Sequence, residues 1–354
     1  MDQAVLFAGM VEAAGMVDAG SVEHAQAFWV TAPGHGEIRP VTLPAPAADE
    51  VLVRTHFSAI SRGTELLVFA GRVPPDQRQA MRAPFQEGEF PGPVKYGYLN
   101  VGVVEAGPPE LLERTVFCLY PHQSAYVLPA TAALPVPDGV PARRAVLAGT
   151  VETAINALWD AAPRLGDRAC VVGAGMVGCC VARLLAQIPG VQVTLVDIDP
   201  ARAPIAAALG VAFAAPDEIV GEHEIVVHTS ASAAGLQRCL GLLAPGGEVL
   251  ELSWYGTSSV SLELGGAFHS ARLGIRASQV GTVAAARQGT RSRRDRLALA
   301  LELLHDPAYD CLISDVSDFT ELPALLPTLA DRPGLCHLIR YESAAASTTT
   351  SNGE

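Results

Sequence analysis

Apolar and polar residues alternate along much of the first third of the chain, in the period-two pattern of half-buried β-strands. The alternation is clearest at 50–55, and shorter strand-like stretches lie at 27–30, 37–41, 101–104, 116–119 and 124–127. Proline and glycine separate these stretches, as they do in domains of short strands and tight turns. The pattern predicts a compact, barrel-like β domain up to about residue 137. Residues 1–25 lack the alternation and are interpreted as an N-terminal extension.

Near Pro141 the apolar spacing changes to that of helices, and a domain boundary is expected close by. The pattern then predicts strands that alternate with helices, which implies a parallel sheet with right-handed crossovers and an α/β fold class. The predicted strands are 170–172, 191–196, 225–228 and 248–252, and the predicted helices are 142–147, 152–161, 176–187, 201–209 and 233–243. A helix at 296–304, a strand at 311–316, a helix at 321–329, a strand at 336–341 and a disordered tail at 343–354 complete the chain.

The strongest motif follows the strand at 170–172. The residues Gly173, Ala174, Gly175, Met176, Val177 and Gly178 form a G-x-G-x-x-G fingerprint that opens directly into an apolar helix. Such glycines permit a tight turn, the approach of backbone N–H groups to a pyrophosphate, and close packing of helix on strand. The helix N-terminus adds N–H donors and partial positive charge for phosphates. A dinucleotide site is therefore predicted here.

The residues that follow favour NAD as the cofactor. Asp197 ends the next strand, about 20 residues past the glycines, where its carboxylate can accept hydrogen bonds from a ribose diol and would repel the 2′-phosphate of NADP. Arg202 lies one helical turn further on, where stacking on adenine and capping of the surface are equally open interpretations. Thr229, just after the strand at 225–228, is a further candidate contact to the cofactor.

Charge and cysteine content limit the possible partners and compartment. The formal net charge of −13 opposes binding to nucleic acid and to anionic membranes. One basic run, 287–296, is interpreted as the solvated start of a helix, with a phosphate-contacting loop as the alternative. The seven cysteines form no C-x-x-C pair and mostly lie in apolar runs, and Asp2 and Glu12 stand where a secretory signal would be basic. A cytoplasmic protein with reduced thiols is expected.

Together these features resemble the medium-chain dehydrogenase/reductase family. Residues 44–53 resemble its P-x-P-x-x-x-E-V-L-V segment, and Gly246–Gly247 its P-G-G turn before a strand near the nicotinamide. The resemblance implies a GroES-like catalytic domain at 26–155, completed by 305–342, and a doubly wound Rossmann domain at 156–304. It also implies a small-molecule substrate and a homodimer.

The zinc-binding members of that family hold the metal with a Cys after the third strand, a His in a G-H-E motif, and a Cys or acid near the domain boundary. This chain departs at each place: Ser61 or Arg62 replaces the first ligand, Tyr98 the second, and 147–154 offers no thiol. Zinc prefers thiolate, imidazole or carboxylate donors, so no metal is expected. A residual alternative is that acids and imidazoles converge on a site, namely Glu65, Glu152, His56 and His122.

Short stretches, including S-x-G-T-E at 61–65 and F-C-L-Y-P-H-Q at 117–123, are most similar to the bacteriochlorophyllide a dehydrogenase-like branch of the family. Without a metal, a phenol or an ammonium group must protonate the developing alkoxide. The resemblance places several candidates near the cleft, with Tyr98 first and Lys95, Tyr96, Tyr120 and His122 behind it. A core aromatic that only fills the metal cavity is the alternative for Tyr98.

Further side chains are assigned to the same cleft. Glu65 and Glu152 are expected to orient substrate hydroxyls or relay a proton, or else to form ion pairs with Arg62 or Lys95. Arg62 is alternatively a bidentate ligand of the cofactor pyrophosphate. His269 is placed on a loop that can approach the cleft, with Trp254 and Tyr255 as its apolar walls.

Three functions are consistent with the sequence. The leading one is a zinc-independent, NAD(H)-dependent alcohol dehydrogenase or ketone reductase that acts on a polar biosynthetic intermediate. The second is a metal-free reductase of enone C=C bonds. The third is a non-catalytic dinucleotide-binding protein, against which the retained Asp197 argues.

Overall fold

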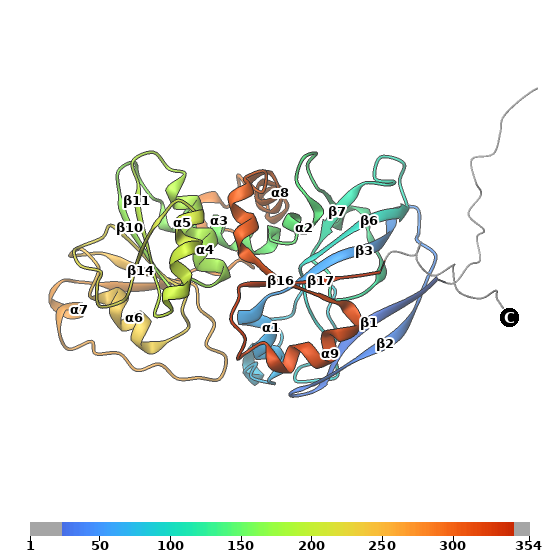
Figure 1. The fold of residues 1–354 in the computed structure, drawn as a ribbon, viewed down its shortest axis with the longest axis horizontal. Helices are drawn as coiled ribbons and strands as arrows, with labels where there is room; N and C mark the ends of the chain where they lie inside the picture. Colours follow the sequence, from blue (N-terminus) through green and yellow to red (C-terminus); the bar gives the residue numbers. More distant parts are fainter. Residues whose placement is uncertain (1–22, 343–354) are drawn as a thin grey trace, which may run out of the picture.

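The computed structural model describes residues 23–342 and divides them into two lobes (Figure 1). One lobe is built mainly from antiparallel strands of the first 140 residues and is completed by the C-terminal strands. The other is built on a parallel sheet from the middle of the chain. Most of the predicted N-terminal extension and all of the predicted tail lie outside the described residues.

The β-rich lobe contains two sheets. The larger has the strand order β16-β17-β3-β6-β7-β9, with β8 paired to β3, and the smaller has the order β2-β1-β5-β4. Apart from the parallel pair β16 and β17, the strands run antiparallel. The strands are β1 (Glu23–Ala32), β2 (His35–Leu43), β3 (Glu50–Ile60), β4 (Glu87–Gly88), β5 (Val94–Lys95), β6 (Asn100–Ala106), β7 (Thr115–Cys118), β8 (Ala125–Pro129), β9 (Leu134–Pro135), β16 (Ile313–Asp318) and β17 (Cys336–Arg340).

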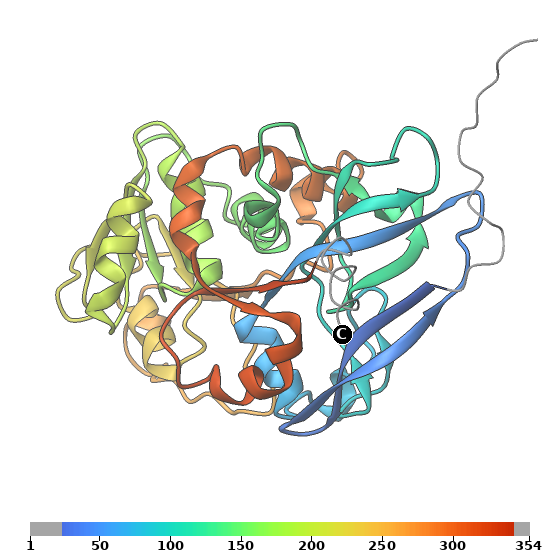
Figure 2. The same ribbon diagram turned by 45° about the vertical axis from the view of Figure 1, so that its right-hand side comes forward.

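Each of the longer predicted strands of this lobe is present. The first begins at Glu23, inside the predicted extension, and forms a long hairpin with β2 along one side of the lobe (Figure 2). In β3 the burial alternates residue by residue before the strand enters the core fully at Ala59 and Ile60. Two short helices that cover this lobe are α1 (Arg62–Phe69) and α9 (Leu322–Leu325), the latter flanked by 3₁₀ turns.

The second lobe is a Rossmann sheet. Its parallel strands follow the order β12-β11-β10-β13-β14-β15, so the order reverses between β10 and β13. They are β10 (Arg168–Val172), β11 (Gln192–Val196), β12 (Ala212–Ala214), β13 (Ile225–His228), β14 (Glu248–Glu251) and β15 (Gly274–Ala277). The helices are α4 (Met176–Ala186), α5 (Ala203–Ala208), α6 (Ala233–Leu240) and α7 (Ala267–Ser270). The parallel sheet expected from the alternating pattern is confirmed, and β12 and β15 extend it at its two edges.

Helices α2 (Ala142–Ala145), α3 (Ala148–Ala161) and α8 (Arg293–Leu303) lie between the lobes (Figure 1). Helix α3 packs against both α4 and α8. One apolar core cluster continues through this region, from Leu99 and Phe117 of the β-rich lobe to Leu185 and Leu195 of the Rossmann sheet. The two lobes are therefore joined by a shared core and not by a flexible linker.

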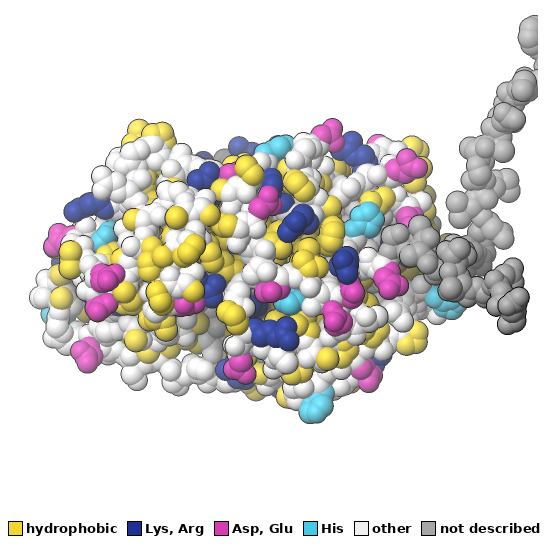
Figure 3. Space-filling model, in the orientation of Figure 1, with side chains coloured by type: hydrophobic (Ala, Val, Ile, Leu, Met, Phe, Trp, Pro, Cys, Tyr) yellow, Lys and Arg dark blue, Asp and Glu magenta, His cyan; other side chains and the backbone are white. Residues whose placement is uncertain are grey.

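All seven cysteines are free, and six of them are buried. Burial raises the pKa of Cys170, Cys179 and Cys336 to about 12, so these thiols are inert core residues. No helix among residues 23–342 is long and apolar enough to cross a membrane. On the face shown in Figure 3, acidic and basic side chains are interspersed with apolar ones.

Candidate active site

The glycine turn between β10 and α4 is shaped for a ligand. A Cβ at Gly178 would lie 1.9 Å from the carbonyl oxygen of Gly173, and one at Gly173, which has a φ of +113°, would lie 2.7 Å from the amide nitrogen of Ser230. A Cβ at Gly175 would meet no atom within 4 Å. Gly173 and Gly178 are therefore required by the fold. Gly175 instead faces open space at the N-terminus of α4, where backbone N–H groups can receive a phosphate.

Asp197 stands at the end of β11 beside this turn. One carboxylate oxygen accepts from the amide of Ala174 at 2.7 Å, and the other from the amide of Asp199 at 2.9 Å. Each oxygen retains a lone pair for a ribose hydroxyl. Arg202 forms an ion pair of 3.4 Å with Asp199. Thr229 donates to the carbonyl oxygen of Gly173 at 2.7 Å and thereby stabilises the turn.

In the β-rich lobe, Tyr98 and Ser61 meet directly. The phenol of Tyr98 donates to the hydroxyl oxygen of Ser61 at 2.6 Å. Burial raises the pKa of Tyr98 to about 12, although its hydrogen bonds to Ser61 and Thr64 oppose the rise. Tyr98 therefore carries its proton at neutral pH and is able to donate it. Ser61 and Tyr98 are the residues that the sequence resemblance aligns with two metal ligands of zinc-binding proteins, and their side chains contact each other.

A buried polar chain lies behind this pair. Glu65 accepts from the amide of Ser61 at 2.8 Å and from Nε2 of His122 at 2.8 Å. Nδ1 of His122 lies 2.7 Å from the hydroxyl of Ser58, which in turn lies 2.9 Å from the hydroxyl of Tyr341. Because a carboxylate only accepts, His122 donates to Glu65 through Nε2. Gly97, with a φ of +124°, allows the backbone to pass close to the imidazole.

The structure brings Tyr98, Glu65 and His122 together but places other candidates elsewhere. Lys95 is buried and bound to Glu87 and, at 2.6 Å, to Gln123. Glu152 on α3 pairs with Arg296 at 3.0 Å. The expectation that Arg62 or Lys95 would pair with Glu65 or Glu152 is therefore wrong, because nearer partners hold all four groups.

Arg62 holds the segment before β17 in place. Its terminal nitrogens donate to the carbonyl oxygens of Leu329, Arg332 at 2.7 Å and Gly334 at 2.9 Å. Burial lowers the pKa of Arg62, and the positive charge of Arg202 lowers it further. Its contact with a pyrophosphate stays a prediction.

The donors at the positions that resemble zinc ligands do not suit zinc, because a serine hydroxyl and a phenol replace thiolate and imidazole. Among residues 23–342, no three His, Cys, Asp or Glu side chains gather in a way that could hold a metal ion. Of the four residues considered for an alternative metal site, only Glu65 and His122 contact each other.

Sequence reasoning missed a second polar cluster, at the carboxyl ends of β13 and β14. His228 is fully buried and lies 2.7 Å from Glu251, its partner in the sheet register. Its other nitrogen lies 2.7 Å from the hydroxyl of Ser230. The signal present in the sequence is a titratable residue at the end of each strand, directly after apolar residues.

The segment after β14 brings this edge to the β-rich lobe. Trp254 packs against the apolar cluster that includes Phe69 and Tyr96 and that Tyr98 also touches. A Cβ at Gly256 would lie 2.7 Å from the carbonyl oxygen of Arg72. Tyr255 is not the apolar wall that the sequence suggested, because its hydroxyl donates to Glu251 at 3.0 Å.

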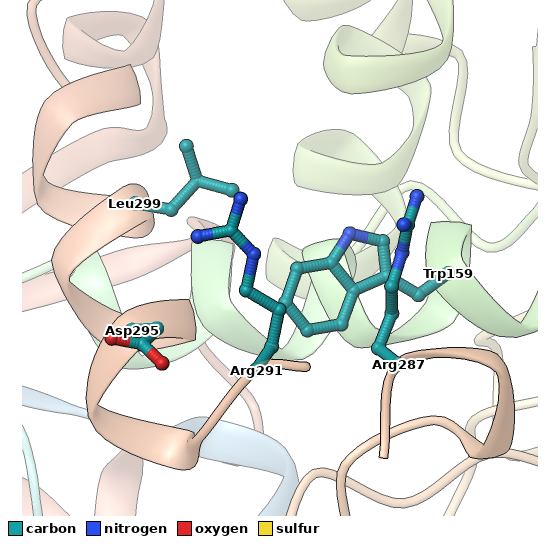
Figure 4. A pocket seen from close by; sticks show the side chains of 5 residues that line it. All are labelled: Trp159, Arg287, Arg291, Asp295 and Leu299. Carbon is teal, nitrogen blue, oxygen red and sulfur yellow. The ribbon is translucent and has the colours of Figure 1, made fainter. Parts of the chain in front are cut away.

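The basic run at 287–296 divides into two parts. Arg287 and Arg291 flank Trp159 in a shallow pocket between α3 and α8, and Arg287 lies over the indole at 5.9 Å from the ring centroid (Figure 4). Ser292 and Asp295 form a capping box that starts α8. Arg296 is buried against Glu152. The segment therefore contains the capped start of helix α8, and Arg296 within it is buried.

No protein-family model matches the chain, and no curated protein sequence matches it. Solved structures do. L-idonate 5-dehydrogenase of Escherichia coli K-12 is similar with a TM-score of 0.75 and 14% identity, over 90% of this chain and 99% of that one. A Sinorhizobium meliloti dehydrogenase bound to NADP has a TM-score of 0.73 and 15% identity over the same shares. An Escherichia coli CFT073 alcohol dehydrogenase complexed with NADH has 0.69 and 15%, again over 90% and 99%.

Such low identities establish the fold alone. The chain is an α/β protein that combines an antiparallel β-rich domain with a six-stranded parallel sheet, as in the GroES-like and Rossmann domains of the medium-chain dehydrogenases.

Proposed function

We propose that this protein is an NAD(H)-dependent, zinc-independent alcohol dehydrogenase or ketone reductase in which Tyr98 is the proton donor. The observation that carries the proposal is the hydrogen bond of 2.6 Å from Tyr98 to Ser61. It supports the proposal because Tyr98 is protonated and stands at a position that the sequence resemblance assigns to a metal ligand. The similar structures bound to NADH and NADP support a dinucleotide at the glycine turn.

When bound, the nicotinamide cofactor supplies or accepts the hydride. Backbone N–H groups at Gly175 and the start of α4 bind the pyrophosphate, and the carboxylate of Asp197 accepts from the adenosine ribose. That carboxylate would repel a 2′-phosphate, which favours NAD over NADP. These residues would hold the cofactor at the carboxyl ends of the parallel strands.

The chain's own groups manage the proton. In carbonyl reduction the phenolic proton of Tyr98 leaves its hydrogen bond to Ser61 and passes to the developing alkoxide oxygen, and in alcohol oxidation the phenolate takes a proton back from the substrate hydroxyl. The hydroxyl of Ser61 orients the phenol. Glu65 and His122 act indirectly. His122 is hydrogen-bonded to Glu65, and Glu65 holds the amide of Ser61 in place.

The test removes the phenolic hydroxyl while keeping the ring. Tyr98→Phe is expected to retain NADH binding but to lower kcat by about 10²- to 10⁴-fold, the usual contribution of a general acid. The matched control is Tyr96→Phe, which removes the hydroxyl of the neighbouring ring, 6.1 Å away between centroids. Ligand binding is followed by fluorescence, and turnover by NADH absorbance with polar cyclic ketones and secondary alcohols.

Two outcomes contradict the proposal. Failure of the wild-type protein to bind NADH at millimolar concentration would remove the dinucleotide on which it depends. Equal loss of turnover in both tyrosine variants would show that the effect is not specific to the hydroxyl of Tyr98. With labelled NADH, deuterium is expected on the carbinol carbon, and its appearance on the β-carbon of an enone would assign C=C reduction instead.

A further inference from the structure

The buried pair His228–Glu251 lies outside the proton-donor site and is not used by the mechanism above. The two residues end adjacent parallel strands and face each other in register. Nδ1 of His228 lies 2.9 Å and 2.7 Å from the two carboxylate oxygens of Glu251. The imidazole is 0% exposed, so it can reach a ligand only through its neighbours.

The donors and acceptors around Glu251 can be assigned from its contacts. Its carboxylate accepts from the amide of Ser253 at 2.7 Å and from the hydroxyl of Tyr255 at 3.0 Å. Although burial opposes ionisation, the hydrogen bonds from His228 and Ser253 hold the pKa of Glu251 below its usual value. An ionised carboxylate only accepts, so Nδ1 of His228 carries a proton and donates it to Glu251.

The hydrogen-bonded chain continues to Ser230. Nε2 of His228 lies 2.7 Å from the hydroxyl of Ser230. The hydroxyl of Ser232 lies 2.9 Å from the same oxygen. A hydroxyl can make three hydrogen bonds, so these two neighbours leave one position free on Ser230, which is an exposed residue.

The fold leaves space for this arrangement. Gly235 on α6 lies against the cluster, where a Cβ would stand 2.3 Å from the hydroxyl of Ser230 and 2.9 Å from Nε2 of His228. Ser232 caps the same helix by accepting from the amide of Gly235 at 3.0 Å. The serine hydroxyls are thus positioned by the helix start and by the buried pair together.

The position of Ser230 identifies what meets it. The strand order reverses between β10 and β13, and a dinucleotide lies across that crevice at the carboxyl ends of the strands. The adenosine half belongs to β10 and β11, where the glycine turn and Asp197 lie. Ser230 follows β13, on the other half, and its amide stands close to the Gly173 turn.

We propose that His228 and Glu251 are positioning residues that hold the hydroxyl of Ser230 in place for a hydrogen bond to the nicotinamide half of the cofactor. The group that it meets there is the carboxamide or a ribose hydroxyl. The inference rests on the proposed function, because it requires a nicotinamide dinucleotide in this crevice.

Calorimetric titration with NADH and with ADP tests it, since ADP fills only the adenosine half. Ser230→Ala is expected to weaken NADH binding about 3- to 10-fold, the effect of one hydrogen bond, and to leave ADP binding unchanged. Ser230→Thr keeps the hydroxyl and is expected to restore NADH binding. The reduced 3-acetylpyridine analogue lacks the NH₂ group, so a loss of the Ser230→Ala effect with this analogue assigns the carboxamide, and a persistent effect assigns the ribose.

The buried pair is tested by Glu251→Gln. The single oxygen of an amide at 251 cannot accept from His228, the amide of Ser253 and the hydroxyl of Tyr255 at once, so the imidazole should lose its fixed position. NADH binding should then weaken although residue 251 does not touch the ligand. Ser230→Ala and Glu251→Gln both act through the hydroxyl oxygen of Ser230. The double variant should therefore bind NADH no more weakly than whichever single variant binds it less tightly. Unchanged NADH binding by Ser230→Ala, an equal loss for ADP, or additive effects would each overturn the inference. Failure of the wild-type protein to bind NADH while it still binds ADP would instead count against the proposed function itself.

Discussion

At the scale of single residues, the candidate active site depends on a buried carboxylate. Glu65 is 5% exposed, and its two oxygens accept from the amide of Ser61 and from His122. These bonds hold Ser61 where the phenol of Tyr98 can donate to it. The position of the proposed proton donor therefore depends on the charge state and geometry of a residue that does not touch it.

Glu65→Gln tests this dependence. An amide at 65 can accept from only one of the two donors and points its NH₂ at the other, which leaves a buried hydrogen bond unmade. We expect a loss of about 1–3 kcal/mol in the free energy of unfolding. Urea denaturation measures it, with Glu89→Gln as the control, since Glu89 is 76% exposed in its ion pair with Arg82 and should change stability by less than about 0.5 kcal/mol. Equal effects of the two variants would show that Glu65 is not a structural anchor.

The sequence indicated which residues belong to the site better than it indicated their partners. The glycines and Asp197 were predictable because one local strand–turn–helix pattern contains them. Glu65 and His122 were named as candidates, but their contact joins positions 57 residues apart and depends on how α1 and the loop before β8 meet. The pairing of Glu152 with Arg296 spans 144 residues and was likewise set by the tertiary fold.

At the scale of elements, strands with clear alternation were predicted and short or exposed ones were not. Strand β12 has three residues, and β15 exposes three of its four, so neither shows an apolar period. Only Ser61 separates the end of β3 at Ile60 from the start of helix α1, and the helix has no side-chain cap, so the sequence did not reveal its start. Helix α8 begins at Arg293, three residues before its predicted start, although its Ser292–Asp295 capping box is a readable signal.

The turn between β10 and α4 allows two glycines to be separated by function. In Gly175→Ala the new methyl group meets no atom within 4 Å and φ is −78°, so stability should be unchanged. The methyl group does occupy the space that a pyrophosphate would take, and NADH binding should weaken by at least about tenfold. Thermal unfolding and NADH titration of the same sample provide the comparison.

Gly178→Ala is the matched opposite. Its methyl group would stand 1.9 Å from the carbonyl oxygen of Gly173, so the helix must move and the protein should lose stability as well as NADH binding. If Gly175→Ala unfolded as readily as Gly178→Ala, or bound NADH like the wild type, the open space at Gly175 would not be a phosphate site.

At the scale of the whole molecule, one buried arginine joins the elements between the lobes. Arg296 on α8 is 1% exposed and pairs with Glu152 of α3 at 3.0 Å. It also donates to the side-chain oxygen of Asn156 and to the carbonyl oxygens of Val280 and Thr282, in the loop that follows β15. A single side chain thus connects α3, α8 and the edge of the Rossmann sheet.

Arg296→Leu should accordingly destabilise the protein strongly. Glu152, Asn156 and two carbonyl oxygens would lose their donor in a buried place, and removal of one partner from a buried ion pair costs about 3–5 kcal/mol. Glu152→Gln keeps an oxygen that accepts from Arg296, so its loss should be smaller, below about 2 kcal/mol. Urea denaturation near neutral pH orders the two variants, and the reverse order would mean that Arg296 is not the element that joins them.

The same pair gives the stability a dependence on pH. Burial raises the pKa of Glu152, even though Arg296 opposes the rise. A carboxyl whose pKa is higher in the folded state favours folding below its unfolded pKa of about 4.3, and that contribution is lost as the pH rises through the folded pKa. Glu152→Gln cannot ionise, so the stability of the wild type relative to this variant should fall as the pH increases over that interval. Denaturation of both proteins in steps from pH 4 to pH 8 measures the difference, and a difference that stayed constant or grew with pH would show that the ion pair outweighs the burial of the carboxylate.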